Sequence, residues 1–423
     1  MAGSRQPRGT RKSARDGARA NSKAPVLDID ALIDDPHTRI VVCCGAGGVG
    51  KTTTTAALGL RAAESGRRVV VLTIDPARRL AQSLGLTTLD NTPRPVKGID
   101  DSRGGTLDAM MLDMKRTFDD VVQAHAAPDK AQQILANPFY QAVSSSFAGT
   151  QEYMAMEKLG QLRLEADRDP DNPRWDLIVV DTPPSRSALD FLDAPKRLGS
   201  FLDGRFIRLL AGPAKAGGRA YLKVFSAGVN IVTTTLTKVL GGQMLTDVQT
   251  FVAALDTMFG GFRERADHTY ALLSDPATAF IVVATPERDA LREASYFVDR
   301  LDAEEMPLAG LVVNRVYRVS APGLSAARAL SAAEQLGDEG NGGSTGASST
   351  GVSSTGVSER TAITQGLLRL HAVQAEIAAR HQALAKRFIA GHPDIPMVEV
   401  PAAAQDIHDL AGLRAVGEAL AGR

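Results

Sequence analysis

A glycine-rich segment, GAGGVGKT at residues 45–52, carries the side chains best suited to chemistry in this chain. It has the spacing G-x-x-x-x-G-K-[ST], follows the mostly apolar run 39–44 and leads into a helical pattern over 51–65. Between a strand and a helix such a loop binds phosphate, because glycines let backbone N–H groups close around an anion. Lys51 would reach the β- and γ-phosphates, and the Thr52 hydroxyl would hold Mg²⁺. The segment therefore predicts a nucleoside triphosphate site rather than an ordinary glycine-rich turn.

The letters of this loop indicate its class. The glycine pair and the threonine run 52–55 resemble the deviant Walker A loop, which usually has a lysine just before the glycine pair. In that class the lysine crosses a dimer interface and stabilises charge on the partner's γ-phosphate. Here the position is Ala46, so this chain cannot supply that cation. The loop residues expected to contact the nucleotide are Gly47, Gly48, Val49, Gly50, Lys51, Thr52 and Thr53.

Aspartates follow two further apolar runs. Asp75 comes directly after the run 68–74, and Pro76 stops that strand. A carboxylate there could orient an attacking water, although capping a following helix over 77–84 is an open alternative. Asp181 follows the run 175–180, where a Walker B-type acid would hold the water shell of Mg²⁺; its alternative is a turn residue. The prolines after Asp181 restrict the backbone, which suits a switch segment.

Strands that alternate with helices must position these residues. The strand candidates are 39–44, 68–74, 175–180, 279–284, 308–313 and 397–400. Nearly continuous apolar runs of this kind are typical of parallel strands covered on both faces. Helical patterns cover 287–301 and 363–388, and a last one covers 407–420. We predict an α/β fold: a doubly wound, mostly parallel sheet of the P-loop NTPase type, with ligands at the carboxyl ends of its strands.

The pattern also predicts how the chain is divided. Residues 1–30 form a basic, disordered tail, for which an acidic partner surface is a second interpretation. A nucleotide-binding domain is expected from 31–103 with 173–195 and 275–423, within which the low-complexity segment 337–358 is a mobile loop. Residues 104–172 with 196–274 show helical patterns and no convincing strand of the sheet, which predicts an inserted helical subdomain.

Composition excludes several classes of protein. The 423 residues carry a formal net charge of zero, so no overall field recruits nucleic acid or a membrane surface. We find no apolar stretch long enough for a bilayer span, and no apolar run near the N-terminus that would make a signal peptide. The two cysteines, Cys43 and Cys44, are adjacent in a strand and must point to opposite faces, so they read as core residues in a reducing cytoplasm.

Four segments, in order, resemble the arsenite-pump and tail-anchored-protein-targeting ATPase family. They are GAGGVGKT at 45–52, IDPARRL at 74–80, DTPPSRS at 181–187 and LVVNRV at 311–316. The similarity runs from about residue 38 to the C-terminus. It implies a dimeric ATPase of the deviant Walker A class that uses ATP and Mg²⁺, with a nucleotide domain and a helical subdomain in each subunit. The subunits would open and close with the nucleotide, and we expect a bacterial member.

The resemblance also assigns roles to single residues. It makes Asp75 the water-activating aspartate and Asp181 the switch aspartate near Mg²⁺. Asn314 would hydrogen-bond the adenine, Glu287 would contact the nucleotide near the dimer interface, and Pro401 would pack on the base. From the residues alone, Asn314 is equally a turn residue at a strand end.

Three departures limit what the resemblance implies. Arsenite activation needs clustered thiolates, and the chain has none beyond its first strand. The CxxC zinc clasp of eukaryotic targeting members is absent, so we expect no zinc. Because Ala46 replaces the trans lysine, we expect either pairing with a paralogous subunit that keeps it, or a homodimer in which Arg78 or Arg79 supplies the charge. The alternatives are a low-activity regulatory subunit and a positioning ATPase of the partitioning type.

The helical subdomain is the expected contact for a client. In the targeting branch it forms an apolar groove for a hydrophobic helix, and its counterpart here contains Met110, Met111, Met114, Met154, Met156, Phe147 and Phe201. Methionine-rich surfaces suit varied apolar ligands, but methionine at helical spacing is more often core. We expect no nucleic acid partner and no stable membrane insertion.

Overall fold

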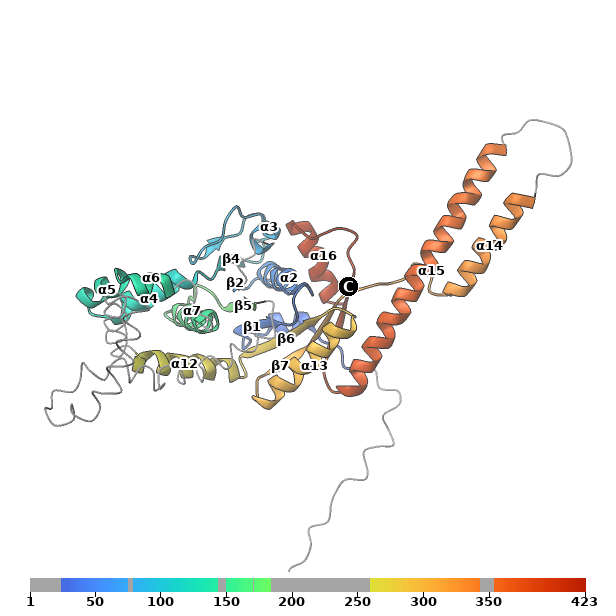
Figure 1. The fold of residues 1–423 in the computed structure, drawn as a ribbon. Coiled ribbons are helices and arrows are strands. Elements are labelled where there is room, and N and C mark those ends of the chain that lie inside the picture. The colour runs from blue at the N-terminus through green and yellow to red at the C-terminus, as the bar shows by residue number, and fades with distance from the viewer. Residues whose placement is uncertain (1–23, 75–78, 144–149, 170, 184–258, 343–353) are drawn as a thin grey trace, which may run out of the picture.

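The computed structural model describes residues 24–74, 79–143, 150–169, 171–183, 259–342 and 354–423 (Figure 1). Within them the strands form an eight-stranded sheet in the order β3-β4-β2-β5-β1-β6-β7-β8. Their bounds are β1 Ile40–Cys44, β2 Arg68–Thr73, β3 Arg94–Pro95, β4 Thr106–Met111, β5 Leu177–Asp181, β6 Thr278–Ala284, β7 Leu308–Val316 and β8 Met397–Pro401. β3 pairs antiparallel with β4, and every other pairing in this sheet is parallel. The predicted mostly parallel α/β sheet is confirmed.

Helices cover both faces of the sheet, as a doubly wound fold requires. One apolar cluster joins the sheet to α1 (Ile29–Asp34), α2 (Lys51–Glu64), α3 (Arg79–Ser83) and α16 (Leu410–Leu420). The cluster on the other face joins it to α4 (Met114–His125), α5 (Pro128–Leu135), α6 (Pro138–Val143), α7 (Thr150–Ala166), α12 (Phe259–Ser274), α13 (Arg288–Ala303) and α15 (Ser354–Gly391). α14 (Ala326–Gly342) packs against α15. The last helix, α16, packs against β8 and α2.

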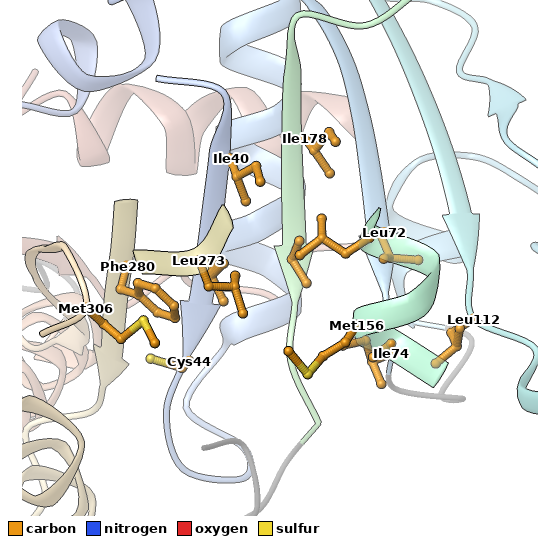
Figure 2. Packing of buried hydrophobic residues seen from close by; sticks show 14 of the residues in the cluster. Ile40, Cys44, Leu72, Ile74, Leu112, Met156, Ile178, Leu273, Phe280 and Met306 are labelled. Atoms are coloured by element: carbon orange, nitrogen blue, oxygen red, sulfur yellow. The ribbon is translucent and has the colours of Figure 1, made fainter. Parts of the chain in front are cut away.

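Alternate residues of each central strand enter opposite clusters. Ile40, Val42 and Cys44 belong to the cluster drawn in Figure 2, together with Leu72 of β2 and Ile178 of β5. Cys43 belongs to the other cluster, so the two cysteines face opposite sides as predicted. Burial raises the pKa of each thiol to about 12, so both stay protonated and unreactive.

The expectation that residues 104–172 contribute no strand is wrong. Residues 106–111 form β4, which pairs in parallel with β2 along its whole length. The segment TLDAMM lacks a continuous apolar run, because Asp108 stands inside it and aspartate is depleted in strands. The indole Nε1 of Trp175 donates to Asp108 Oδ2 at 2.9 Å and satisfies that carboxylate at the sheet. A tertiary contact therefore compensates for an unfavourable residue in the strand.

The expected mobile loop at 337–358 is also too long. α14 continues to Gly342, and α15 begins at Ser354. The two helices pack against each other, and Gln365 Nε2 of α15 donates to the carbonyl oxygen of Ala333 in α14 at 2.9 Å, one turn before the Gly- and Ser-rich sequence begins. Figure 1 shows α14 and α15 as a two-helix arm that extends away from the sheet. We call this pair of helices the arm.

Arg67 holds together the amino ends of the strands, at the end of the sheet opposite the glycine-rich loop. Its guanidinium donates to the Asp176 carboxylate at 2.6 Å and to the carbonyl oxygens of Ile33, Asp35, Thr38 and Asp176 at 2.6 to 3.0 Å. These contacts join α1, the start of β2 and the segment before β5.

None of the helices in the described ranges is long and apolar enough to cross a bilayer.

Candidate functional site

The glycine-rich loop lies between β1 and α2, at the centre of the sheet. Gly45 has φ +148°, and a Cβ there would lie 2.1 Å from the carbonyl oxygen of Val283 in β6. Gly50 has φ +96°, and a Cβ there would lie 2.2 Å from Nδ2 of Asn314. Only glycine fits at these two positions, both because of the positive φ and because of the close neighbours. The predicted phosphate loop therefore has the backbone that its glycines suggest.

The positive end of α2 opens into this loop. Gly50 caps the helix without a side-chain hydrogen bond, which leaves the first N–H groups of α2 directed at the loop. Lys51 is 5% exposed, and its Nζ donates to the carbonyl oxygen of Ala46 at 2.9 Å. The helix terminus and this ammonium group together concentrate positive charge in a backbone cradle, which is suited to a polyphosphate.

Asp181 lies beside the start of α2, fully buried at the end of β5. The hydroxyl of Thr52 donates to its Oδ2 at 2.7 Å, and the hydroxyl of Thr73 donates to the same oxygen at 2.9 Å. Thr73 is the register neighbour of Asp181 on β2. Sequence reasoning brought Thr52 and Asp181 together through Mg²⁺ but missed Thr73, which looks like an ordinary residue of an apolar strand.

A bulge in β7 brings Asn314 to the loop. The register with β8 passes from Val313↔Glu399 to Val316↔Pro401, so β7 holds one extra residue there. Arg315 takes φ +60°, and its N–H donates to Asn314 Oδ1 at 2.9 Å. Asn314 Nδ2 donates to the carbonyl oxygen of Val49 at 2.9 Å. The side chain thus supports the phosphate loop directly, a contact for which the sequence carried no signal.

Glu287 follows β6 and Pro401 ends β8, the two strands on either side of β7. Glu287 is exposed and caps α13 without a side-chain hydrogen bond to the helix. Pro401 is half-buried at the end of β8. His381 of α15 lies close enough to Glu287 for that carboxylate to act on its pKa, and its ring packs edge-on against Tyr317 with the ring centroids 5.6 Å apart. The base of the arm therefore adjoins this side of the site.

Several predicted residues cannot be placed. Asp75, Arg78, Phe147 and Phe201 lie outside the described residues, as does the side chain of Arg79. Thr53 is half-buried in the first turn of α2. Of the groove methionines, Met110, Met154 and Met156 are at most 1% exposed and belong to the apolar cluster with α4 and α7, which favours the core interpretation. Within the described ranges, no group of three or more His, Cys, Asp or Glu side chains is arranged to hold a metal ion.

Comparison with known proteins agrees with this site. A sequence model of the anion-transporting ATPase family matches residues 38–323. "ATPase ARSA2" of Chlamydomonas reinhardtii is 26% identical over 298 residues, 69% of this chain and 72% of that protein. "ATPase GET3" of Ajellomyces dermatitidis is 26% identical over 289 residues, 67% of this chain and 75% of that protein. The "Arsenical pump-driving ATPase" of Escherichia coli is 26% identical over 281 residues, but the similarity spans only 39% of that protein.

The family match extends over more than half of the chain, and it includes the loop, Asp181, Glu287 and Asn314. The resemblance inferred from the four motifs is confirmed. The chain belongs to the anion-transporting ATPase family and is an ATP-hydrolysing enzyme.

Proposed function

We propose that the chain is a dimeric switch that binds Mg·ATP in the glycine-rich loop and changes its contact with a partner when ATP is hydrolysed. The contact set of Asp181 is the observation that supports this proposal most. A buried carboxylate that accepts from Thr52 and from Thr73 is held in one position by the protein's own side chains. Fixed charge beside a phosphate cradle is what phosphoryl transfer requires.

In this proposal each site residue has a separate task. Residues 47–53 enclose the phosphates, and Lys51 neutralises the β- and γ-phosphates. Thr52 would hold Mg²⁺ directly and Asp181 would hold it through water, since oxygen donors of this kind fit a hard cation. When bound, the ion would draw charge from the phosphate oxygens. Asp75 orients the attacking water, Asn314 and Pro401 hold the base, and Glu287 contacts the nucleotide near the subunit interface.

Ala46 decides which partner we propose. The chain has no lysine to place at its neighbour's γ-phosphate, so two copies would lack both trans cations. We propose pairing with a paralogous subunit that keeps this lysine and completes the site on this chain. In a homodimer, Arg78 or Arg79 would have to take that part.

Restoring the cation tests the pairing. In Ala46→Lys we expect ATP turnover of the isolated chain to rise by about 10³-fold, the lower end of what a trans arginine finger contributes. Ala46→Met, of similar length but uncharged, is the matched control and should leave turnover low. Calorimetry with Mg·ATP should show binding in all three proteins. Brisk turnover of the unchanged chain that rises with its concentration would contradict the need for a paralogue.

A regulatory subunit is the second candidate, and Ala46 again is the observation that favours it. Such a subunit binds ATP but hydrolyses little even with its partner. Turnover measured with and without the co-purified partner separates the two candidates. A liposome pelleting assay tests the third, a positioning ATPase that cycles on a membrane.

We further propose that the helical part of 104–172, which excludes β4, forms a subdomain with 196–274 that contacts a partner or an apolar client helix. We also propose that the protein works in the cytoplasm. The proposal includes no zinc, because both cysteines are buried in β1. Metal analysis of the purified complex tests the last point. Photo-crosslinking to a hydrophobic helix, with and without ATP, tests the client.

A further inference from the structure

The carboxyl end of β2 carries a buried hydroxyl group whose task the proposed function leaves open. Thr73 is the last residue of this strand and is 1% exposed. The strand is apolar from Val69 to Leu72, and a valine in place of Thr73 would have the same shape without a polar atom to satisfy. A hydroxyl group buried in such a strand costs free energy unless it makes a hydrogen bond, so its partner indicates what it does.

The partner that this hydroxyl reaches is Asp181, the register neighbour of Thr73 on β5. The Thr73 hydroxyl donates to Asp181 Oδ2 at 2.9 Å, and both side chains are buried. A hydrogen bond to an ionised carboxylate is about twice as strong as one between neutral groups. The contact is therefore strong enough to decide in which direction the carboxylate of Asp181 points.

The backbone of Asp181 is held in place by other hydrogen bonds. On the side of β2, the N–H of Ile74 donates to the carbonyl oxygen of Asp181 at 3.0 Å. On the side of β1, the hydroxyl of the next residue, Thr182, donates to the carbonyl oxygen of Cys43 at 2.9 Å. Because these bonds do not involve the Thr73 hydroxyl, its loss would leave the end of β5 in place and would affect the carboxylate alone.

The two hydroxyl groups that donate to Oδ2 differ in their surroundings. Thr52 lies in the first turn of α2, beside the loop, and in the proposed function its oxygen holds Mg²⁺. Thr73 lies within the sheet, and its hydroxyl contacts the site through Asp181. A threonine hydroxyl has a single proton to donate. Thr73 is thus the donor that can stay on the carboxylate whatever Thr52 binds.

We propose that Thr73 is a positioning residue for Mg·ATP, because its hydroxyl holds the carboxylate of Asp181 in the direction in which Asp181 binds the water shell of the ion. This inference rests on the function proposed above for Asp181. Without the donor the carboxylate turns more freely, and part of its interaction with the ion is lost. The loop and Lys51 bind the phosphates without help from Thr73, so nucleotide binding in the absence of the ion stays the same.

Calorimetry with a non-hydrolysable ATP analogue tests this proposal on the full chain and needs no partner subunit. The ratio of the affinity in excess Mg²⁺ to the affinity in EDTA gives the contribution of the ion. Thr73→Val keeps the shape of the side chain but has no donor. In this variant we expect the ratio to fall about tenfold while the affinity in EDTA stays the same. Thr73→Ser keeps the donor and should retain most of the ratio.

Thr278→Val is the matched control. Thr278 is a buried threonine at the amino end of β6, opposite the loop, and its hydroxyl donates to the carbonyl oxygen of Leu272 at 2.7 Å. This variant should lose thermal stability without any change in the ratio. If circular dichroism shows that Thr73→Val does not fold, Thr73→Ala takes its place as the variant without a donor.

A double-mutant cycle shows whether Thr73 acts through Asp181. Asp181→Asn should lower the ratio by itself, because the amide has no charge to offer the ion. Residues that act through one contact give effects that do not add, so Thr73→Val combined with Asp181→Asn should cause no further fall.

Three results would overturn the role of Thr73 and leave the proposed function intact. They are an unchanged ratio in Thr73→Val, a loss of affinity that is equal in Mg²⁺ and in EDTA, and a full additional loss in the double variant. If the unchanged chain bound the analogue equally well in Mg²⁺ and in EDTA, the proposed function of Asp181 would fail, and the role of Thr73 would fail with it.

Discussion

Asp181 and Asn314 show how single side chains prepare the loop for a ligand. The buried carboxylate of Asp181 is fixed by two hydroxyl groups that reach it from α2 and β2. Asn314 reaches the loop from the far side of β1, through the bulge in β7. Both contacts are made by the protein's own side chains, and they hold the loop in a geometry suited to a ligand.

Asn314→Ala tests whether this residue supports the loop or only reads the base. Loss of the Nδ2–Val49 hydrogen bond should weaken nucleotide binding by about fivefold, the equivalent of about 1 kcal/mol. If the loop contact matters, Mg·ATP, Mg·GTP and Mg·tripolyphosphate should all lose affinity in calorimetry. Asn314→Asp, which keeps the acceptor for the N–H of Arg315 but loses the donor, should behave in the same way. A loss confined to ATP would contradict the supporting role.

At the scale of elements, the two ends of the sheet have different tasks, one functional and one structural. The carboxyl ends of the strands carry the site. At their amino ends Arg67 joins the neighbouring segments through one ion pair and several hydrogen bonds to carbonyl oxygens. A planar guanidinium can satisfy so many acceptors at once, which an ammonium group cannot.

Replacing Arg67 should therefore destabilise the whole sheet. We expect Arg67→Ala to lower the free energy of unfolding by about 3 kcal/mol or more, because buried carbonyl oxygens lose their donor and Oδ1 of Asp176 loses its ion pair. Arg67→Lys should recover only part of this loss. Arg68→Ala is the control, since Arg68 makes an exposed hydrogen bond to Asn172. Urea unfolding measures all three, and equal stability of Arg67→Ala and Arg68→Ala would contradict the role of Arg67.

The sequence predicted the central strands because each is a nearly continuous apolar run, and it predicted the loop because glycine spacing reports directly on backbone geometry. It failed where a distant contact decides the outcome. Asp108 interrupts the apolar pattern of β4, and the hydrogen bond from Trp175 that satisfies it comes from a residue far away in the sequence. The glycines of 337–342 are typical of a loop, but this segment belongs to α14, which packs against α15. Thr73 and the loop contact of Asn314 depend on register between strands, which no local pattern encodes.

At the scale of the whole molecule, His381 joins the arm to Tyr317, the residue that follows β7. The N–H of Tyr317 donates to His381 Nδ1 at 3.3 Å, which requires that nitrogen to be unprotonated. Burial lowers the pKa of His381, and Arg380 adds to this effect while Glu287 opposes it. The unfolded chain therefore takes up the proton at higher pH than the folded chain does, so stability falls as pH drops below about 6.5.

This linkage predicts the effect of acid on the melting temperature. Between about pH 7.5 and about pH 5.5 the protein should lose thermal stability, and His381→Asn, which keeps an acceptor near Nδ1 but cannot titrate, should lose less. His37→Asn is the control, because the side chain of His37 is 91% exposed. Differential scanning fluorimetry at both pH values measures the slopes. An unchanged slope in His381→Asn would show that this histidine does not link stability to pH.

The place where α15 meets the body has a mechanical consequence. From His381 to the start of α15 at Ser354 the helix rises about 40 Å, at 1.5 Å per residue. If α15 tilted by about 10° about its contact with Tyr317 and Glu287, its far end would move by about 7 Å, because the displacement grows with the length of the helix. Small shifts at the strand ends that carry the site would therefore become displacements of several ångströms at the far end of α15.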